Sequence, residues 1–479
     1  MNKQQRGKTG KQGSGAASRQ TAISWWQLSL LGVACTIGTG YFLGAGIGLT
    51  IGGPAFLVAF LLAAAGTYCV FDALARMTVA DPQQGSFRSY AKLAFGRWAG
   101  FGSGWVYCCS ELMMMGSQMT ALALFSRFWF PGIPIWLLSA GYAVLGLGVI
   151  LTGTQGFDRA ENLLAIVKVA AIVMFVLLAS AILLDIIGWT AHRPALPGNW
   201  LPAGGLGLWS SLIYAFYAFG GIEVMGLMAV RLKNRRDAPR SGKVMLAVLA
   251  VIYTLSLGAA LTLVPWSSFL PEESPFVIAL SDPGLPWVPH MFTGVFIVAG
   301  FSTMVAALFA IISILVSLAE EQDAPVGLAR KGWRGLPMRA VAFTAGSMVI
   351  SILLSLLLPE RLYELVTTAA GLMLLYNWLF ILLSSGRLLQ PSAGGRFKRI
   401  IGLFLIALAV AGTMLHQTTR PGFWLSLGFM LMISSVTVLM QRKWTHSSLR
   451  QEEPAVWEIQ RDSQDNRTWI FELEPKRGE

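Results

Sequence analysis

The sequence alternates long apolar stretches with shorter polar segments. A helix needs about 20 apolar residues to cross the hydrocarbon core of a bilayer. Twelve stretches approach that length and are continuous, without the two-residue alternation of membrane barrel strands. The pattern therefore predicts an all-α integral membrane protein with about 12 transmembrane helices. The predicted spans are 26–49, 54–75, 99–125, 134–152, 162–187, 208–230, 244–264, 290–318, 340–358, 363–385, 400–415 and 422–440.

Composition supports this prediction. Of the 479 residues, 55% are hydrophobic and only 13% are charged, and the mean hydropathy is +0.61. About one quarter of the residues of a soluble protein are charged. The chain therefore carries too few charged side chains to cover a water-exposed surface. We expect a protein surrounded by membrane lipid rather than a soluble enzyme.

The net charge of +12 raises the question of a nucleic-acid partner, which the distribution of basic residues answers. With twelve spans and a cytoplasmic N-terminus, 31 of the 36 Lys and Arg residues fall on the cytoplasmic side, and Lys168 lies inside a span. The other four fall outside: Arg127, Arg193, Arg361 and Arg420. This asymmetry follows the positive-inside rule. We expect a multi-pass protein of the plasma (inner) membrane with both termini cytoplasmic and no nucleic-acid partner.

The expected organisation has three parts. Residues 1–24 form a polar, basic cytoplasmic arm that is too long before the first apolar run for a cleavable signal peptide. Residues 25–441 form the transmembrane domain. Residues 442–479 form a cytoplasmic tail, in which 455–473 shows alternation that fits either a hairpin or a disordered segment.

The positions of the cysteines and histidines predict neither a metal site nor a set of catalytic residues. All four cysteines lie inside apolar stretches, where reduced thiols are expected. The four histidines are scattered over loops and helix ends without ligand spacing. We therefore expect no cofactor, no bound metal and no enzymatic activity.

Glycines interrupt two of the spans. The first contains Gly38-Thr39-Gly40, and the sixth contains Gly220-Gly221. Small residues four apart in the first span are also typical of close helix packing. Breaks in the first and sixth helices are typical of transporters built from two inverted five-helix repeats. The repeats are then expected at about 26–187 and 208–385, followed by two further helices at about 400–440.

Such breaks have a definite chemistry. Free amides at 38–40, together with the positive end of the following half-helix, would stabilise a carboxylate. Uncapped carbonyls at Ala218, Phe219 and Ile222 would accept hydrogen bonds from an ammonium group. An anion site facing a cation site fits the zwitterion of an α-amino acid.

Several motifs are similar to those of amino-acid permeases of the amino acid–polyamine–organocation superfamily. Residues 38–44 resemble GTGLFLG, 81–91 resemble PxxGSFxxYA, 100–107 resemble GFxxGWxY, and 218–226 resemble AFxGxELVG. The resemblance implies a LeuT-type fold and alternating access around a midplane site. It implies substrate contacts from the first and sixth spans, with Tyr217 as the aromatic residue that closes over the substrate. The implied substrate-binding residues are Thr36, Ile37, Gly38, Thr39, Gly40, Tyr217, Ala218, Phe219, Gly220 and Ile222.

Ionisable residues inside the spans are few, and each is a functional candidate because charge is costly in a bilayer. The resemblance implies proton coupling at Lys168, since some proton-coupled relatives carry a lysine there; the alternative is snorkelling to the cytoplasmic interface. Glu111 has two functional interpretations: it contacts the substrate, or it carries a proton. The structural alternative is a hydrogen-bonded core carboxyl. Glu223 is expected to cap amides freed by the sixth-span break.

The sequence departs from the family pattern near the end of the second span. Asp72 and Arg76 exchange the usual basic and acidic positions but keep the spacing of four residues that allows an ion pair. Polar Gln118 stands where many relatives carry glutamate. These departures affect the expected ion pairs that gate the transport pathway and the identity of the substrate more than they affect the fold.

These observations predict a permease that imports a neutral L-amino acid by H⁺ symport. An amino-acid exchanger and a non-transporting amino-acid sensor on the same fold are the alternatives. The sequence does not identify the amino acid.

Overall fold

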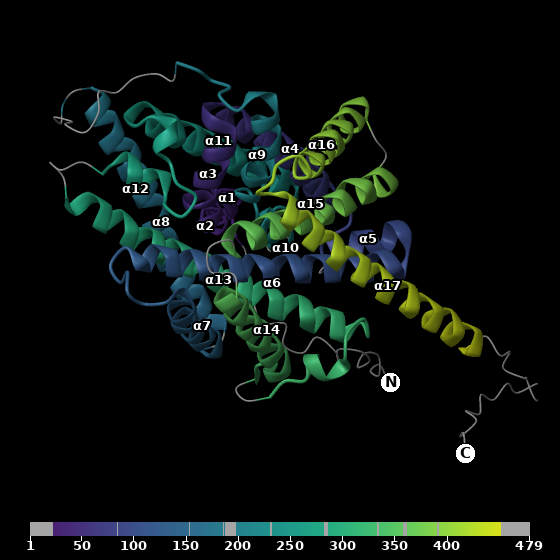
Figure 1. Ribbon diagram of the computed structural model, residues 1–479. Coiled ribbons are helices and arrows are strands. Elements are labelled where there is room, and N and C mark those ends of the chain that lie inside the picture. The colour runs from purple at the N-terminus through teal and green to yellow at the C-terminus, as the bar shows by residue number, and fades with distance from the viewer. Residues whose placement is uncertain are drawn as a thin grey trace, which may run out of the picture.

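The structure is a computed structural model that describes residues 23–83, 85–152, 154–184, 186, 198–229, 232–281, 286–332, 335–357, 362–389 and 392–451. Its α-helices follow one another without a β-sheet in the described ranges (Figure 1). They are α1 (Trp25–Thr36), α2 (Thr39–Phe42), α3 (Gly44–Gly52), α4 (Phe56–Ala80), α5 (Phe87–Phe95), α6 (Arg97–Arg127), α7 (Ile135–Leu151), α8 (Thr154–Leu183), α9 (Gly204–Tyr217), α10 (Ile222–Met228), α11 (Ala238–Leu263), α12 (Pro275–Ala279), α13 (Trp287–Glu320), α14 (Met338–Leu357), α15 (Leu362–Leu388), α16 (Ala393–Gly412) and α17 (Arg420–Gln451).

Each predicted span coincides with one helix or with a broken set of helices. The first corresponds to α1, α2 and α3, and the sixth to α9 and α10. By length and composition alone, six helical stretches of the described residues are able to cross a membrane. The all-α membrane prediction is therefore confirmed. The six stretches are Thr39–Ala80, Arg235–Leu263, Trp287–Glu320, Met338–Leu357, Leu362–Leu388 and Arg420–Arg442.

Contacts between loops sort the helix ends onto two faces. Lys92 of α5, after the second span, forms an ion pair of 2.8 Å with Glu321, after the eighth. Trp129, after the third span, donates a hydrogen bond of 2.9 Å to His290 at the start of α13. The loops after the second and eighth spans thus meet each other, as do the loops after the third and seventh, which agrees with spans that cross in alternate directions.

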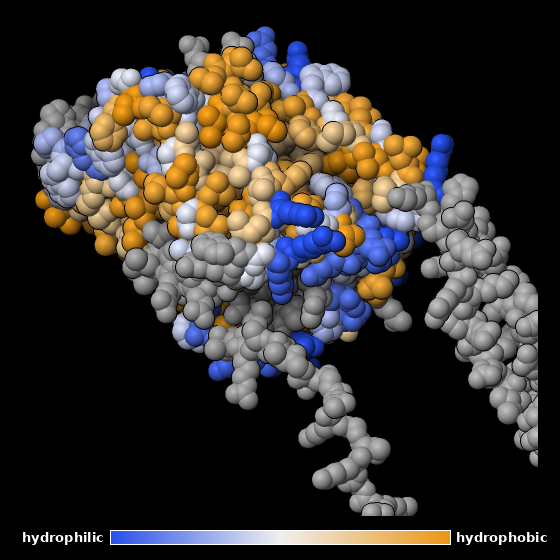
Figure 2. Space-filling model, turned by 90° about the horizontal axis from the view of Figure 1, so that it is seen from below, coloured by the Kyte–Doolittle hydropathy of each residue, from blue (hydrophilic) through white to orange (hydrophobic). Residues whose placement is uncertain are grey.

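The surface between these faces is largely apolar. Figure 2 shows hydrophobic residues over much of the visible face, with strongly hydrophilic residues gathered in separate groups. Val144 is 70% exposed and Leu177 is 64% exposed, each on a helix expected to contact lipid. In a membrane protein such residues face acyl chains, so they do not carry the free-energy cost of exposing apolar surface to water.

The last helix continues past the apolar stretch that predicts the twelfth span. That stretch is expected to end at 440, and α17 continues to Gln451, into the segment predicted as the tail. On this extension the ring of Trp444 packs edge-on against Phe101 and lies 4.4 Å beneath the guanidinium of Arg97. These contacts with α6 explain why the helix continues beyond its apolar stretch. The predicted arm up to residue 22 and the segment 455–473 lie outside the described residues.

The broken first span lies in the interior of the helix assembly. In Figure 1, α1 to α3 lie among the other helices rather than at the edge of the molecule. Every residue of α3 except Thr50 is buried. Helices α4, α9, α11 and α13 contact this span. A chain break placed here is shielded from lipid, which is the condition under which a membrane helix tolerates one.

Candidate functional site

The first break lies between α1 and α2. The chain leaves α1 at Ile37, whose N–H still donates to the Val33 carbonyl at 3.1 Å, and passes through extended backbone at Gly38. Within the described chain, the backbone N–H groups of Gly38, Thr39 and Gly40 donate no hydrogen bond. Amides at the start of a helical segment are the groups that would bind an anion.

The second break lies between α9 and α10. Gly221 has φ +104°, in the left-handed region that favours glycine. Its N–H donates a hydrogen bond of 3.0 Å to Glu223 Oε2, and the indole N–H of Trp378 donates to Oε1 of the same carboxylate. The prediction that Glu223 caps an amide freed by the break is therefore confirmed.

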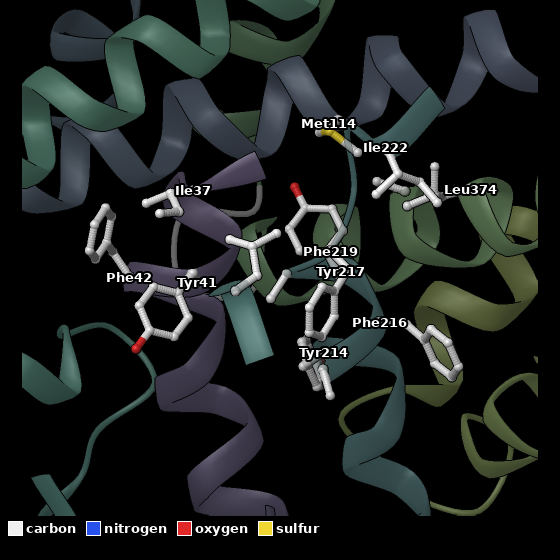
Figure 3. Close-up of a cluster of buried hydrophobic side chains, with 14 of the residues drawn as sticks. Ile37, Tyr41, Phe42, Met114, Tyr214, Phe216, Tyr217, Phe219, Ile222 and Leu374 are labelled. Atoms are coloured by element: carbon white, nitrogen blue, oxygen red, sulfur yellow. The ribbon is translucent and has the colours of Figure 1, made fainter. Parts of the chain in front are cut away.

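The two breaks pack directly against each other. A Cβ added at Gly221 would lie 3.4 Å from the carbonyl oxygen of Cys35, at the end of α1. A Cβ added at Gly40 would lie 2.9 Å from the ring of Tyr217. Figure 3 shows side chains of the first span beside those of the sixth, with Tyr217 among the latter. The structure thus brings the two predicted halves of the site together.

Hydroxyl and carbonyl groups line this junction. Thr39 Oγ1 and Tyr217 Oη are buried and have no hydrogen-bond partner in the described part of the chain. Buried polar groups are rarely left unsatisfied in native proteins. The carbonyl of Ala218 accepts a hydrogen bond of 3.2 Å from the Tyr253 hydroxyl, which leaves it a second lone pair. The junction can therefore still donate and accept hydrogen bonds.

Ile222 differs from the expectation. It is the first residue of α10, so its carbonyl accepts within the helix and is not uncapped. Its side chain is buried, in the same hydrophobic cluster as Phe219 (Figure 3). Ile222 therefore contributes apolar surface rather than an acceptor for an ammonium group.

An apolar wall adjoins the second break. A Cβ added at Gly220 would lie 3.2 Å from Met114 Cε and 3.2 Å from Leu374 Cδ2. These side chains come from α6 and α15, and both are labelled in Figure 3. Such a wall suits an uncharged side chain.

Glu111 lies on α6 one turn before Met114 and is 3% exposed. It is within electrostatic range of Glu223 and of the Tyr107 hydroxyl. The structure therefore places Glu111 in the interior near the sixth-span break rather than at the membrane surface. Its expected contact with substrate or proton stays a prediction.

Lys168 lies on α8, and its side chain has no exposed surface. A snorkelling lysine keeps its ammonium in water. The snorkelling alternative is therefore wrong for this conformation. Helix α8 packs against α1 and α13, so the lysine sits on an element that adjoins the first-span break.

Several residues around the site were missed by the sequence analysis. Thr303 of α13 lies so close to Gly38 that an added Cβ would approach its Cγ2 to 2.6 Å. Tyr363 of α15 donates a hydrogen bond of 3.3 Å to the Thr39 carbonyl. They reach the site only through folding, and nothing in their local sequence distinguishes them.

Comparison with known proteins agrees with this geometry. The amino acid permease family model matches residues 27–446. The uncharacterized transporter YcgH of Bacillus subtilis is 49% identical over 88% of this chain and 96% of its own length. The aromatic amino acid transport protein AroP is 31% identical in Corynebacterium glutamicum, over 87% of this chain and 95% of that protein. AroP of Escherichia coli K12 is 27% identical, over 83% and 90% respectively. The chain belongs to the amino acid permease family, whose members are membrane transporters and not enzymes.

Proposed function

We propose that this permease imports a neutral L-amino acid by H⁺ symport, with alternating access around the junction of the two helix breaks. The observation that carries the proposal is the meeting of these breaks. Amides at 38–40 would hold the substrate carboxylate, and the Ala218 carbonyl would accept from its ammonium group. The hydroxyls of Thr39 and Tyr217 supply further partners, and Tyr217 would close over the bound substrate.

The wall formed by Met114, Leu374 and Ile222 supports an uncharged substrate side chain. Two relatives are named aromatic amino acid transport proteins. We therefore place phenylalanine, tyrosine and tryptophan first among the neutral substrates. Aromatic side chains gain most from an apolar wall because they bury the largest area.

Proton coupling is assigned to Lys168 because its buried side chain lies on α8, which packs against α1 of the broken first span. The proposed architecture is a LeuT-type fold of two inverted repeats, in the plasma membrane with both termini cytoplasmic. The excess of basic residues on the face that carries Lys92 and Glu321 supports this orientation.

Uptake into proteoliposomes tests the proposal. Purified protein is reconstituted into vesicles that contain no amino acid, and each of the twenty labelled amino acids in turn is added outside, with an acidic exterior. We expect accumulation of a neutral amino acid that a protonophore abolishes. Uptake that requires preloaded amino acid would instead establish exchange, and binding without flux would establish a sensor; either result contradicts symport.

A further inference from the structure

A basic pocket opens between α4, α15 and α16, near the ends of these helices. The hollow has a cavity volume of about 50 Å³ and is partly open to its surroundings. Its polar lining includes Asp72 and Arg76 of α4, Ser392, and Lys398 and Arg399 of α16. It lies apart from the helix breaks, none of whose residues line it.

The charges of this pocket do not balance. Asp72 Oδ2 lies 2.9 Å from Arg76 Nε, which confirms the ion pair predicted from their spacing, and 3.2 Å from Lys398 Nζ. A single carboxylate is thus shared by two cations. Arg399 forms no ion pair or hydrogen bond with any residue that the structure describes. The pocket therefore carries a net charge of about +2, from three basic side chains and one acid.

The protonated state of Lys398 is favoured in this pocket. Burial lowers its pKa, but the hydrogen bond to Tyr68 and the charge of Asp72 outweigh burial and raise the pKa above its ordinary value. Its Nζ also lies 4.7 Å from the Tyr68 ring centroid. The lysine is thus held as a fixed cation that faces the hollow.

The start of α16 adds to the positive potential. Ser392 caps this 20-residue helix, and its Oγ accepts a hydrogen bond of 3.2 Å from the Gly395 N–H. In the described chain, the N–H groups of Ala393 and Gly394 have no acceptor. Free amides and the helix dipole favour an anion at this end.

The pocket lies at the expected depth of the lipid headgroups. Lys398 and Arg399 directly precede the predicted eleventh span, which begins at 400, and Arg76 directly follows the second, which ends at 75. Ile400 and Phe404, on the opposite face of α16, are 62% and 63% exposed and face the acyl chains beyond it. A basic pocket at this depth matches the phosphate of a lipid headgroup better than a soluble anion.

We propose that this pocket binds the phosphate headgroup of an anionic phospholipid. Arg399 and Lys398 contact the phosphate, and Asp72 positions Lys398 and Arg76 around it. Because the pocket joins α4 to α15 and α16, the lipid bridges elements far apart in the sequence. The inference goes beyond the transported substrate and does not depend on it.

Lipid binding to the purified full-length protein tests this site. Native mass spectrometry in a neutral detergent compares dioleoyl-phosphatidylglycerol with dioleoyl-phosphatidylcholine, and inorganic phosphate serves as the soluble competitor. We expect selective retention of one phosphatidylglycerol. Arg399→Gln should weaken it about fivefold, as the loss of one basic contact near a membrane surface implies. Arg399 forms no ion pair or hydrogen bond with the described residues, so Arg399→Gln should fold.

Arg236→Gln is the matched control, because Arg236 is exposed after the sixth span and lies outside the pocket. It should retain the lipid as the unmodified protein does. Equal retention in Arg399→Gln, or an equal loss in Arg236→Gln, would overturn the site. Displacement of the lipid by an equal concentration of inorganic phosphate would overturn the lipid assignment and leave a phosphate site.

Discussion

The backbone N–H of Gly221 donates a hydrogen bond of 3.0 Å to Oε2 of Glu223, two residues further along the chain. The second oxygen of that carboxylate accepts from the indole of Trp378 on α15. One buried side chain thus satisfies an amide at the helix break and ties the break to α15. The arrangement holds the sixth span open without an unsatisfied donor at Gly221.

Replacement of Glu223 should therefore damage the break. Glu223→Leu leaves the Gly221 amide and the Trp378 indole buried without an acceptor, at a cost of about 1–3 kcal/mol each. We expect lower thermal stability in detergent and loss of transport. Glu223→Gln retains one acceptor oxygen, so its thermal stability should lie between that of the unmodified protein and that of Glu223→Leu. If Glu223→Leu and Glu223→Gln had the same thermal stability as each other, Glu223 would not act as a cap.

The close contact between Gly40 and Tyr217 should be equally sensitive to substitution. An alanine methyl at residue 40 would lie 2.9 Å from the Tyr217 ring, so the ring must move. We expect Gly40→Ala to weaken substrate affinity roughly tenfold or more, equivalent to about 1.4 kcal/mol. Gly346→Ala is the control, because Gly346 is exposed and its added methyl meets no atom within 4 Å. Equal affinities in both variants would contradict a site at this junction.

Lys168→Met tests the coupling assignment. The substitution keeps an unbranched chain of similar length in the buried space but removes the ammonium. We expect substrate binding to persist within a few fold by thermal shift, while accumulation driven by a pH gradient is lost. Accumulation at the unmodified rate would exclude Lys168 as the proton carrier and leave the site itself intact.

Acid should loosen the contact between α5 and the segment after α13. Burial raises the pKa of Glu321, but hydrogen bonds from Lys92 and Arg88 outweigh burial and bring the pKa below its ordinary value of 4.5. A carboxyl with a lowered pKa stabilises the folded state above its unfolded pKa, and this stabilisation is lost as pH falls through the folded value. Thermal unfolding of Glu321→Gln and unmodified protein should therefore differ at neutral pH and converge well below pH 4.5.

Asp323 should act in the opposite direction. Burial raises its pKa, and the hydrogen bond from Arg97 only partly offsets this effect. A raised carboxyl pKa means that protonation favours the folded state as pH falls. Asp323→Asn should accordingly remove a small gain in stability on mild acidification. A pH profile unchanged by this variant would contradict the assignment.

The features that could be predicted from the sequence were those determined by residues close together in the chain. Continuous apolar runs predicted the spans, and the glycines of the first and sixth runs predicted the breaks, because helix interruption depends on adjacent residues. The pair Asp72 and Arg76 followed from helical spacing. The partners Thr303 and Trp378 could not be predicted, since they join the site through contacts between helices distant in the chain.

Other differences have similar causes. The extension of α17 to Gln451 depends on the packing of Trp444 against α6, which hydropathy does not register. The carbonyl of Ile222 was assigned to the break because the restart of the helix depends on the φ of Gly221, which sequence alone does not define. Burial of Lys168 likewise required the placement of α8 among its neighbours.

The central claim is that the two breaks hold both charged ends of one amino acid. Thermal stabilisation of purified protein measures this most directly, since a ligand at 100 times its Kd adds about 2.7 kcal/mol. The best neutral amino acid is compared with its methyl ester and its deaminated acid, which lack the anionic and cationic ends. We expect stabilisation by the intact amino acid and almost none by either analogue. Equal stabilisation by an analogue would contradict recognition at both breaks.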